Sequence, residues 1–174
     1  MIYINENNVY LKLAEETIKE YISNSKRVAI PSPLPPELDK RAGAFVSIKK
    51  NGKLRGCIGT IKATQENLAK EIIENAISAS TRDPRFPSIR EEELEELDIS
   101  VDVLGQAEKI DSTEDLDPQK YGVIVEKGNK RGLLLPNLEG VDTVEEQLSI
   151  AMRKAGIYSM KDLQLYRFQV ERYE

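Results

Sequence analysis

The residue best suited to chemistry is Cys57, the only cysteine of the chain, which lies between Gly56 and Gly59 and two residues after Arg55. The thiolate of a cysteine is a nucleophile, and a neighbouring guanidinium favours this form. Glycines beside the thiol leave room for a ligand or another backbone to approach. The alternative is structural, because an unpaired cysteine often packs as a small hydrophobic residue, and the glycines then mark a β-bulge. Cys57 is therefore a candidate nucleophile, with Arg55, Gly56 and Gly59 as candidate ligand-binding residues.

A second group of functional residue types lies in Arg82-Asp83-Pro84-Arg85-Phe86-Pro87. The two prolines exclude regular structure, so the charged residues lie in a loop. Arg82 and Arg85 suit a carboxylate, a phosphate or an RNA backbone, and Asp83 could assist a Cys57 nucleophile. The alternative is an ion-pair network that fixes an irregular loop, since buried polar groups need partners.

A β-hairpin is predicted to position Cys57. Ala44–Ile48 has the composition of a strand, Asn51-Gly52 is typical of a type I′ turn, and Leu54–Ile61 is the return strand. Side chains alternate between faces, so Arg55 and Cys57 share one face, roughly 7 Å apart. A helix expected from residue 64 to residue 80, capped by its first residue, would pack back across the strands. That crossover would bring residues 82–86 near one end of the hairpin.

The rest of the chain indicates an α+β fold with a mixed, largely antiparallel sheet and flanking helices. An amphipathic helix is predicted over about 9–25, and a capping box at 88–91 opens a short acidic helix through 96. Two strands, a helix and a strand then recur, which indicates an internal duplication with repeats at about 43–104 and 121–172. The second copy has a helix over 143–155 that ends at Gly156. The whole chain, 1–174, is expected to form one domain, and the pattern leaves open two lobes with a cleft between them.

Composition excludes several kinds of function. The 174 residues carry a formal net charge of −5 with 6% aromatics and no tryptophan, which argues against a broad nucleic-acid surface. No histidine is present, so a zinc site and Ser-His-Asp or Cys-His catalysis are excluded, and one cysteine cannot form an intrachain disulfide. We expect no metal, no cofactor, no membrane span and a cytoplasmic location.

Several blocks of the sequence resemble the AMMECR family, found in bacteria and archaea as component A of the AmmeMemoRadiSam system. These blocks are Gly43-Ala44-Phe45-Val46, Leu54–Thr60, Thr81–Pro87, Arg131-Gly132-Leu133-Leu134-Leu135-Pro136 and Arg153-Lys154-Ala155-Gly156. The resemblance implies an α+β fold, a Memo-like protein and a radical-SAM protein as partners, and no agreed biochemical activity. Met152 stands where relatives often carry a second cysteine, so a Cys-Cys redox pair cannot be essential in this chain.

Three functions follow from these observations. The first is a binding or accessory module for a small anionic ligand or a partner protein. The second is an enzyme with Cys57 as nucleophile, activated by Arg55 and assisted by Asp83. The third is an RNA-binding accessory factor for a modification reaction, which the acidic composition supports least. Whether the chain is an enzyme is left open by its sequence.

Overall fold

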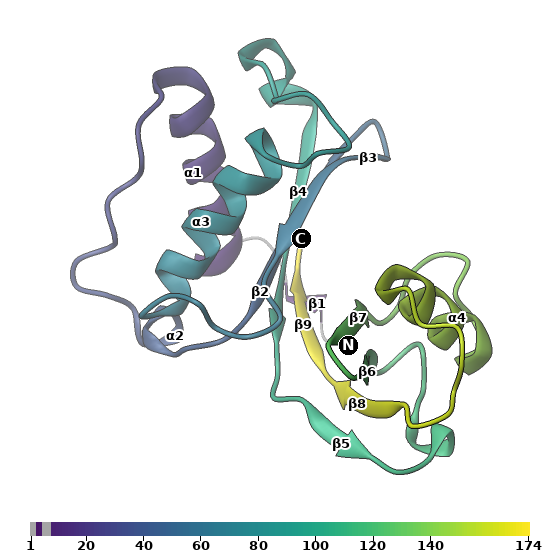
Figure 1. The fold of residues 1–174 in the computed structure, drawn as a ribbon. Coiled ribbons are helices and arrows are strands. Elements are labelled where there is room, and N and C mark those ends of the chain that lie inside the picture. The colour runs from purple at the N-terminus through teal and green to yellow at the C-terminus, as the bar shows by residue number, and fades with distance from the viewer. Residues whose placement is uncertain (1–2, 5–7) are drawn as a thin grey trace. The chain divides into compact units, whose positions relative to one another are not determined.

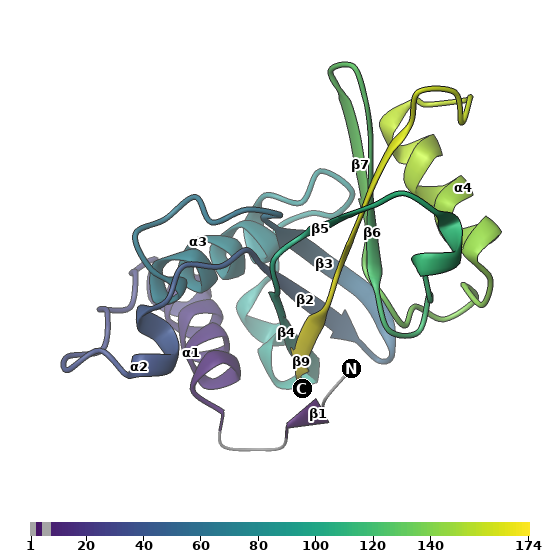
Figure 2. The ribbon, with the colours of Figure 1, turned by 90° about the horizontal axis from the view of Figure 1, so that it is seen from below.

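The computed structural model describes residues 3–4 and 8–174, which divide into two compact units (Figures 1 and 2). The N-terminal unit contains the described residues up to Val103 together with Arg172–Glu174, and the C-terminal unit is Leu104–Glu171. Among the described residues, no helix combines the length and apolar character needed to cross a membrane. Each unit is described below by itself.

The N-terminal unit is a five-stranded sheet in the order β1-β9-β4-β2-β3. Its strands are β1 (Tyr3–Ile4), β2 (Ala44–Lys50), β3 (Lys53–Gly59), β4 (Leu97–Leu104) and β9 (Val170–Tyr173). Strand β2 is antiparallel to both β3 and β4, whereas β1 is parallel to β9. Helices α1 (Val9–Asn24) and α3 (Leu68–Thr81) lie on one side of the sheet in Figure 1, with the short α2 (Pro36–Asp39) beside them.

Alternation along β2 builds the core of this unit. Ala44, Val46 and Ile48 are fully buried and join Ile72 and Ala76 of α3 in one apolar cluster. The turn residues Asn51 and Gly52 both have positive φ, of 51° and 74°, as a type I′ turn requires. The predicted hairpin is therefore present, with β-strand pairing that extends to Lys50 and Lys53.

Two predicted helix starts are wrong. Helix α3 begins at Leu68 and is capped by Asn67, whose side chain accepts a hydrogen bond from the Lys70 amide, whereas Thr64 donates to Glu71. The predicted capping box at 88–91 is also absent: the short 3-10 helix η1 (Glu91–Glu96) is preceded by Arg90, whose amide donates to Glu93. In both cases a side chain other than the expected one accepts the hydrogen bond from a free amide at the helix start.

The C-terminal unit is a four-stranded antiparallel sheet in the order β5-β8-β6-β7. Its elements are β5 (Glu108–Ile110), the 3-10 helix η2 (Thr113–Asp115), β6 (Gly122–Lys127), β7 (Lys130–Leu134), α4 (Val144–Ala155) and β8 (Gln164–Phe168). Helix α4 packs on β6 and β7 through a core that includes Val123, Leu134 and Leu148. The predicted capping box of Thr143 and Glu146 and the left-handed Gly156 at the helix end are both observed.

The two units share one arrangement of strands and helix. In each, the first strand of a hairpin lies between its hairpin partner and the strand that follows the helix: β2 lies between β3 and β4, and β6 between β7 and β8. A Cβ at Gly56 would clash with the carbonyl oxygen of Ala79, and a Cβ at Gly132 with that of Ala151. The same helix-on-hairpin contact therefore occurs in both units, while the internal duplication remains a prediction.

The glycine contacts provide a test of this arrangement. We expect Gly56→Ala and Gly132→Ala each to lower the free energy of unfolding by roughly 1–3 kcal/mol, because the new methyl group must push a helix backbone away from the sheet. Urea unfolding monitored by circular dichroism measures this effect. The control is Gly140→Asn, because no atom lies within 4 Å of its Cβ position and asparagine tolerates a φ of 77°. Unchanged stability of both alanine variants would contradict the close contact.

Candidate functional site

Cys57 lies on β3, on the face of the sheet opposite to α3. Its cross-strand partner on β2 is Ser47, and the Cys57 Sγ lies 3.1 Å from the Ser47 Oγ. Burial raises the pKa of the half-buried Cys57 thiol, with Asp102 adding to this, and the hydrogen bond with Ser47 opposes it only in part. The Arg85 guanidinium lowers this pKa, but less than burial raises it, and Arg55 is not among the groups that act on the thiol. The expected activation of Cys57 by Arg55 is therefore wrong, and the net shift favours the neutral thiol.

The Arg55 guanidinium does not contact the Cys57 thiol, because it binds Glu93 and the Pro87 carbonyl. The pairing register shifts between Ile48 and Lys49, so that Arg55 is the extra residue of a β-bulge. Its Nε and Nη2 donate to the Glu93 carboxylate at 3.1 and 3.0 Å, and its Nη1 donates to the Pro87 carbonyl at 2.8 Å. Arg55 thus links β3 to the segment that precedes η1.

Asp83 ties the loop after α3 to the strand that carries Cys57. Its carboxylate, in a residue only 4% exposed, accepts the Cys57 backbone N–H at 3.0 Å, the Arg85 backbone N–H at 3.0 Å, and Nε and Nη2 of the Arg85 guanidinium at 3.0 and 2.8 Å. The Arg85 side chain, with these backbone donors, holds the pKa of Asp83 well below its usual range despite burial. A carboxylate so engaged is a poor general base, and its observed contacts are structural.

The loop presents two guanidinium groups of different character. Arg85 is paired with Asp83, lies 5.4 Å above the Phe86 ring, and keeps 56% of its side chain exposed. Arg82 lies at the C-terminal end of α3 with an exposed side chain, for which the described part of the chain offers no hydrogen bond or ion pair. The structure therefore brings Cys57, Asp83 and Arg85 together and leaves Arg82 as an exposed cation on the same loop.

The two glycines beside Cys57 are filled by the protein itself. The space above Gly56 is taken by the backbone of Ala79, and the space above Gly59 by the ring of Phe45. Close approach by another part of the chain is therefore observed at both glycines, and the β-bulge at Arg55 also lies directly before Gly56. The Cβ position of neither glycine is open to a ligand.

Buried carboxylates missed by the sequence reasoning complete the surroundings. Glu71, 1% exposed, accepts from the side chain of Thr60 at 2.6 Å and from the backbone amides of Thr64 and Gln65, both at 2.8 Å. Asp102, also 1% exposed, binds Arg172 through two hydrogen bonds of 2.7 and 2.8 Å. Both could have been found in the sequence: Glu71 takes an inward position of an apolar helix, and Asp102 lies between two valines of a strand. Within residues 3–4 and 8–174, no cluster of three or more metal-ligating side chains occurs.

Comparison with known proteins decides the family. The AMMECR1 family profile matches residues 11–173. The chain belongs to the AMMECR1 family. This confirms the resemblance seen in the sequence blocks.

Relatives cover the chain almost completely. A protein of Thermotoga maritima is 52% identical over 168 residues, which are 95% of this chain and 97% of that protein. A protein of Clostridium acetobutylicum is 50% identical over 97% of this chain but only 36% of its own length. The crystal structure of an uncharacterised protein from Pyrococcus horikoshii matches with a TM-score of 0.86 and 33% identity over 94% of this chain and 88% of that one. The AMMECR1 family therefore fixes the α+β fold and assigns no reaction.

Alkylation tests the state of the thiol. We expect iodoacetamide to modify Cys57 with a pH midpoint above that of a free model thiol measured alongside, because burial favours the neutral form. Ser47→Ala should raise the midpoint further, since the Ser47 hydroxyl stabilises the thiolate. Faster labelling than the model thiol at neutral pH would revive the nucleophile hypothesis.

Acid unfolding tests the Arg55–Glu93 pair. The hydrogen bond from Arg55 lowers the pKa of Glu93 to about 2, below the value of about 4.3 in an unfolded chain. The resulting stabilisation is complete above about pH 4.3 and is lost as the pH falls toward 2, and amounts to roughly 1–3 kcal/mol. Glu93→Gln should therefore be less stable at pH 7 and lose less stability between these pH values. The exposed neighbour in Glu91→Gln serves as control, and parallel pH profiles of wild type and Glu93→Gln would contradict the assignment.

Proposed function

We propose that this chain is a binding module whose loop of residues 82–87 holds an anionic group, a carboxylate or a phosphate. The observation that carries the proposal is the exposed Arg82 side chain, three residues before the half-exposed Arg85, on a loop fixed by the buried Asp83. A guanidinium presents a planar fork of donors that matches carboxylate and phosphate oxygens. The loop is held in place before a ligand arrives, which lowers the entropy cost of binding.

The same contacts favour binding over catalysis. The Cys57 thiol has a raised pKa, and the Asp83 carboxylate already accepts four hydrogen bonds. Neither group is prepared for proton transfer or nucleophilic attack at neutral pH. The thiol-dependent enzyme is therefore the second candidate, and the alkylation experiment above separates the two.

The anionic group can belong to a small molecule or to an acidic segment of a partner protein. The AMMECR resemblance points to a Memo-like protein and a radical-SAM protein as partners of this module. An RNA backbone offers the same charge, but the net charge of −5 opposes a broad contact with RNA.

Titration with inorganic phosphate and with acetate tests the site. In the isotope-labelled full chain, we expect the backbone amide signals of Arg82, Arg85 and Cys57 to shift with either anion, and Arg82→Gln to weaken the binding about ten-fold through loss of a charge-assisted contact. Lys161→Gln, which removes an exposed cation of the C-terminal unit, is the control. Equal titration curves for wild type and Arg82→Gln would refute the proposal.

A further inference from the structure

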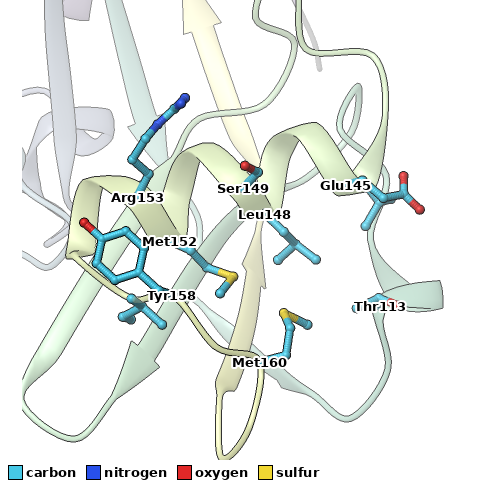
Figure 3. A pocket seen from close by; sticks show the side chains of 10 residues that line it. Thr113, Glu145, Leu148, Ser149, Met152, Arg153, Tyr158 and Met160 are labelled. Atoms are coloured by element: carbon cyan, nitrogen blue, oxygen red, sulfur yellow. The ribbon is translucent and has the colours of Figure 1, made fainter.

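The C-terminal unit has an apolar pocket that the proposed function does not use. It has a volume of about 570 Å³ and lies beside α4, the loop that follows α4, and η2. Figure 3 shows the side chains of Leu148, Met152 and Met160 directed into one space, with Tyr158 next to them. Three large apolar side chains are exposed among the described residues, and two of them, Tyr158 at 86% and Met160 at 51%, line this pocket. Apolar groups gathered at one place on a surface mark an interaction site.

Two parallel stripes of α4 form this surface. The floor contains Val144, Leu148 and Met152, which recur every four residues and therefore share one side of the helix. Beside them runs an exposed polar stripe of Glu145, Ser149 and Arg153, also spaced by four. Glu145 and Arg153 lie toward opposite ends of the helix in Figure 3, with Ser149 between them.

Two of the four charged side chains of α4 bind other groups of the chain, and two do not. Glu146 accepts hydrogen bonds from the backbone amides of Asp142 and Thr143, and Lys154 donates to the Leu133 carbonyl. Glu145 and Arg153, in contrast, have no hydrogen-bond or ion-pair partner for their side chains within the described part of the chain. The only charges of α4 left for another molecule are thus an acid and a base, about 12 Å apart along the helix.

The loop that carries Tyr158 is fastened to the neighbouring hairpin. Lys130 donates to the Gly156 carbonyl at 2.7 Å, and Lys127 donates to the Ser159 carbonyl at 3.3 Å. Gly156 ends α4 in the left-handed conformation, with φ of 66°, and starts this loop. An exposed aromatic residue on a loop held from both sides has little conformational entropy left to lose, which suits an anchor of a protein interface.

We infer that this face of α4 binds the same face of a second copy of the chain. Glu145 and Arg153 are each four residues from Ser149, so an antiparallel pairing of two α4 helices about a two-fold axis at Ser149 places Glu145 against Arg153 of the partner subunit at both ends. The small Ser149 at the axis allows the helices to approach closely. A surface that complements itself under a two-fold rotation is the pattern of an isologous dimer interface. Tyr158, which follows the C-terminal end of one helix, then lies at the N-terminal end of the other, where Thr113 and Glu145 line the pocket.

Charge reversal within one chain tests this inference without a known ligand. Sedimentation velocity of the full chain over a range of concentrations measures the dimer dissociation constant. We expect Glu145→Arg and Arg153→Glu to raise this constant by about ten-fold or more, because each places like charges opposite one another. The double variant Glu145→Arg with Arg153→Glu restores both opposite pairs and should return the constant to near the wild-type value.

An apolar truncation provides the second measurement. Tyr158→Ala should weaken the dimer strongly, whereas Leu54→Ala, which removes the third exposed apolar side chain, 42% exposed and in the other unit, should leave the dimer unchanged. A wild-type chain that stays monomeric at all concentrations, or single reversals that the double variant fails to rescue, would overturn the inference. The arginines at 82 and 85 take no part, so Arg82→Gln should dimerise as the wild type does.

Discussion

The position of the candidate anion site depends on one steric constraint, the absence of a Cβ at residue 56. Because the Ala79 carbonyl occupies that space, α3 lies against the hairpin at the strand that carries Cys57. The helix ends two residues later, at Thr81, so the chain leaves it beside β3 and the next residues are Arg82, Asp83 and Arg85. The close contact between the α3 backbone and β3 thus determines where the loop after α3 begins. The Asp83 carboxylate then fixes this loop by accepting a hydrogen bond from the Cys57 amide.

Three buried carboxylates hold the chain around this contact. Glu71 binds the segment before α3, Asp83 the loop after it, and Glu93 the bulged residue Arg55 of the strand beneath it. An ionised carboxylate is costly to bury unless hydrogen bonds compensate, and each of the three accepts several. Their charge is consequently used inside the protein, which leaves the uncompensated Arg82 as the group of this region with free capacity for an external anion.

The sequence predicted the parts of this arrangement that depend on local pattern. The positive φ angles of Asn51 and Gly52 follow from residue type, and the crossover helix brought residues 82–86 to the hairpin as expected. Predictions from the sequence were wrong where a one-residue shift in strand register or a tertiary contact determines the position of a side chain or the start of a helix. Arg55 lies in the bulge and binds Glu93, and burial raises the pKa of Cys57. The short spacing between Arg55 and Cys57 in the sequence therefore predicted a lowered thiol pKa that the structure does not have. The start of α3 was misplaced because the buried Glu71 engages Thr64, and this contact is not visible in the local sequence.

The two units share one contact between helix and hairpin but present different surfaces. In each, a glycine of the second hairpin strand admits a helix backbone, and the segment after the helix carries the exposed side chains. An amide side chain four residues before the contact donates to a backbone carbonyl at the start of the first hairpin strand, Asn75 to Ala44 in β2 and Gln147 to Tyr121 just before β6. The segment after the helix holds Arg82 and Arg85 in the N-terminal unit, and Tyr158 and Met160 in the C-terminal unit. The residue after the glycine differs in the same sense: Cys57 is half-buried among polar groups, whereas Leu133 is buried. Because the glycine contact fixes where each helix packs on its hairpin, the residue types of the segment after the helix can change without a change of fold. One unit thus presents cations in this segment and the other an apolar anchor.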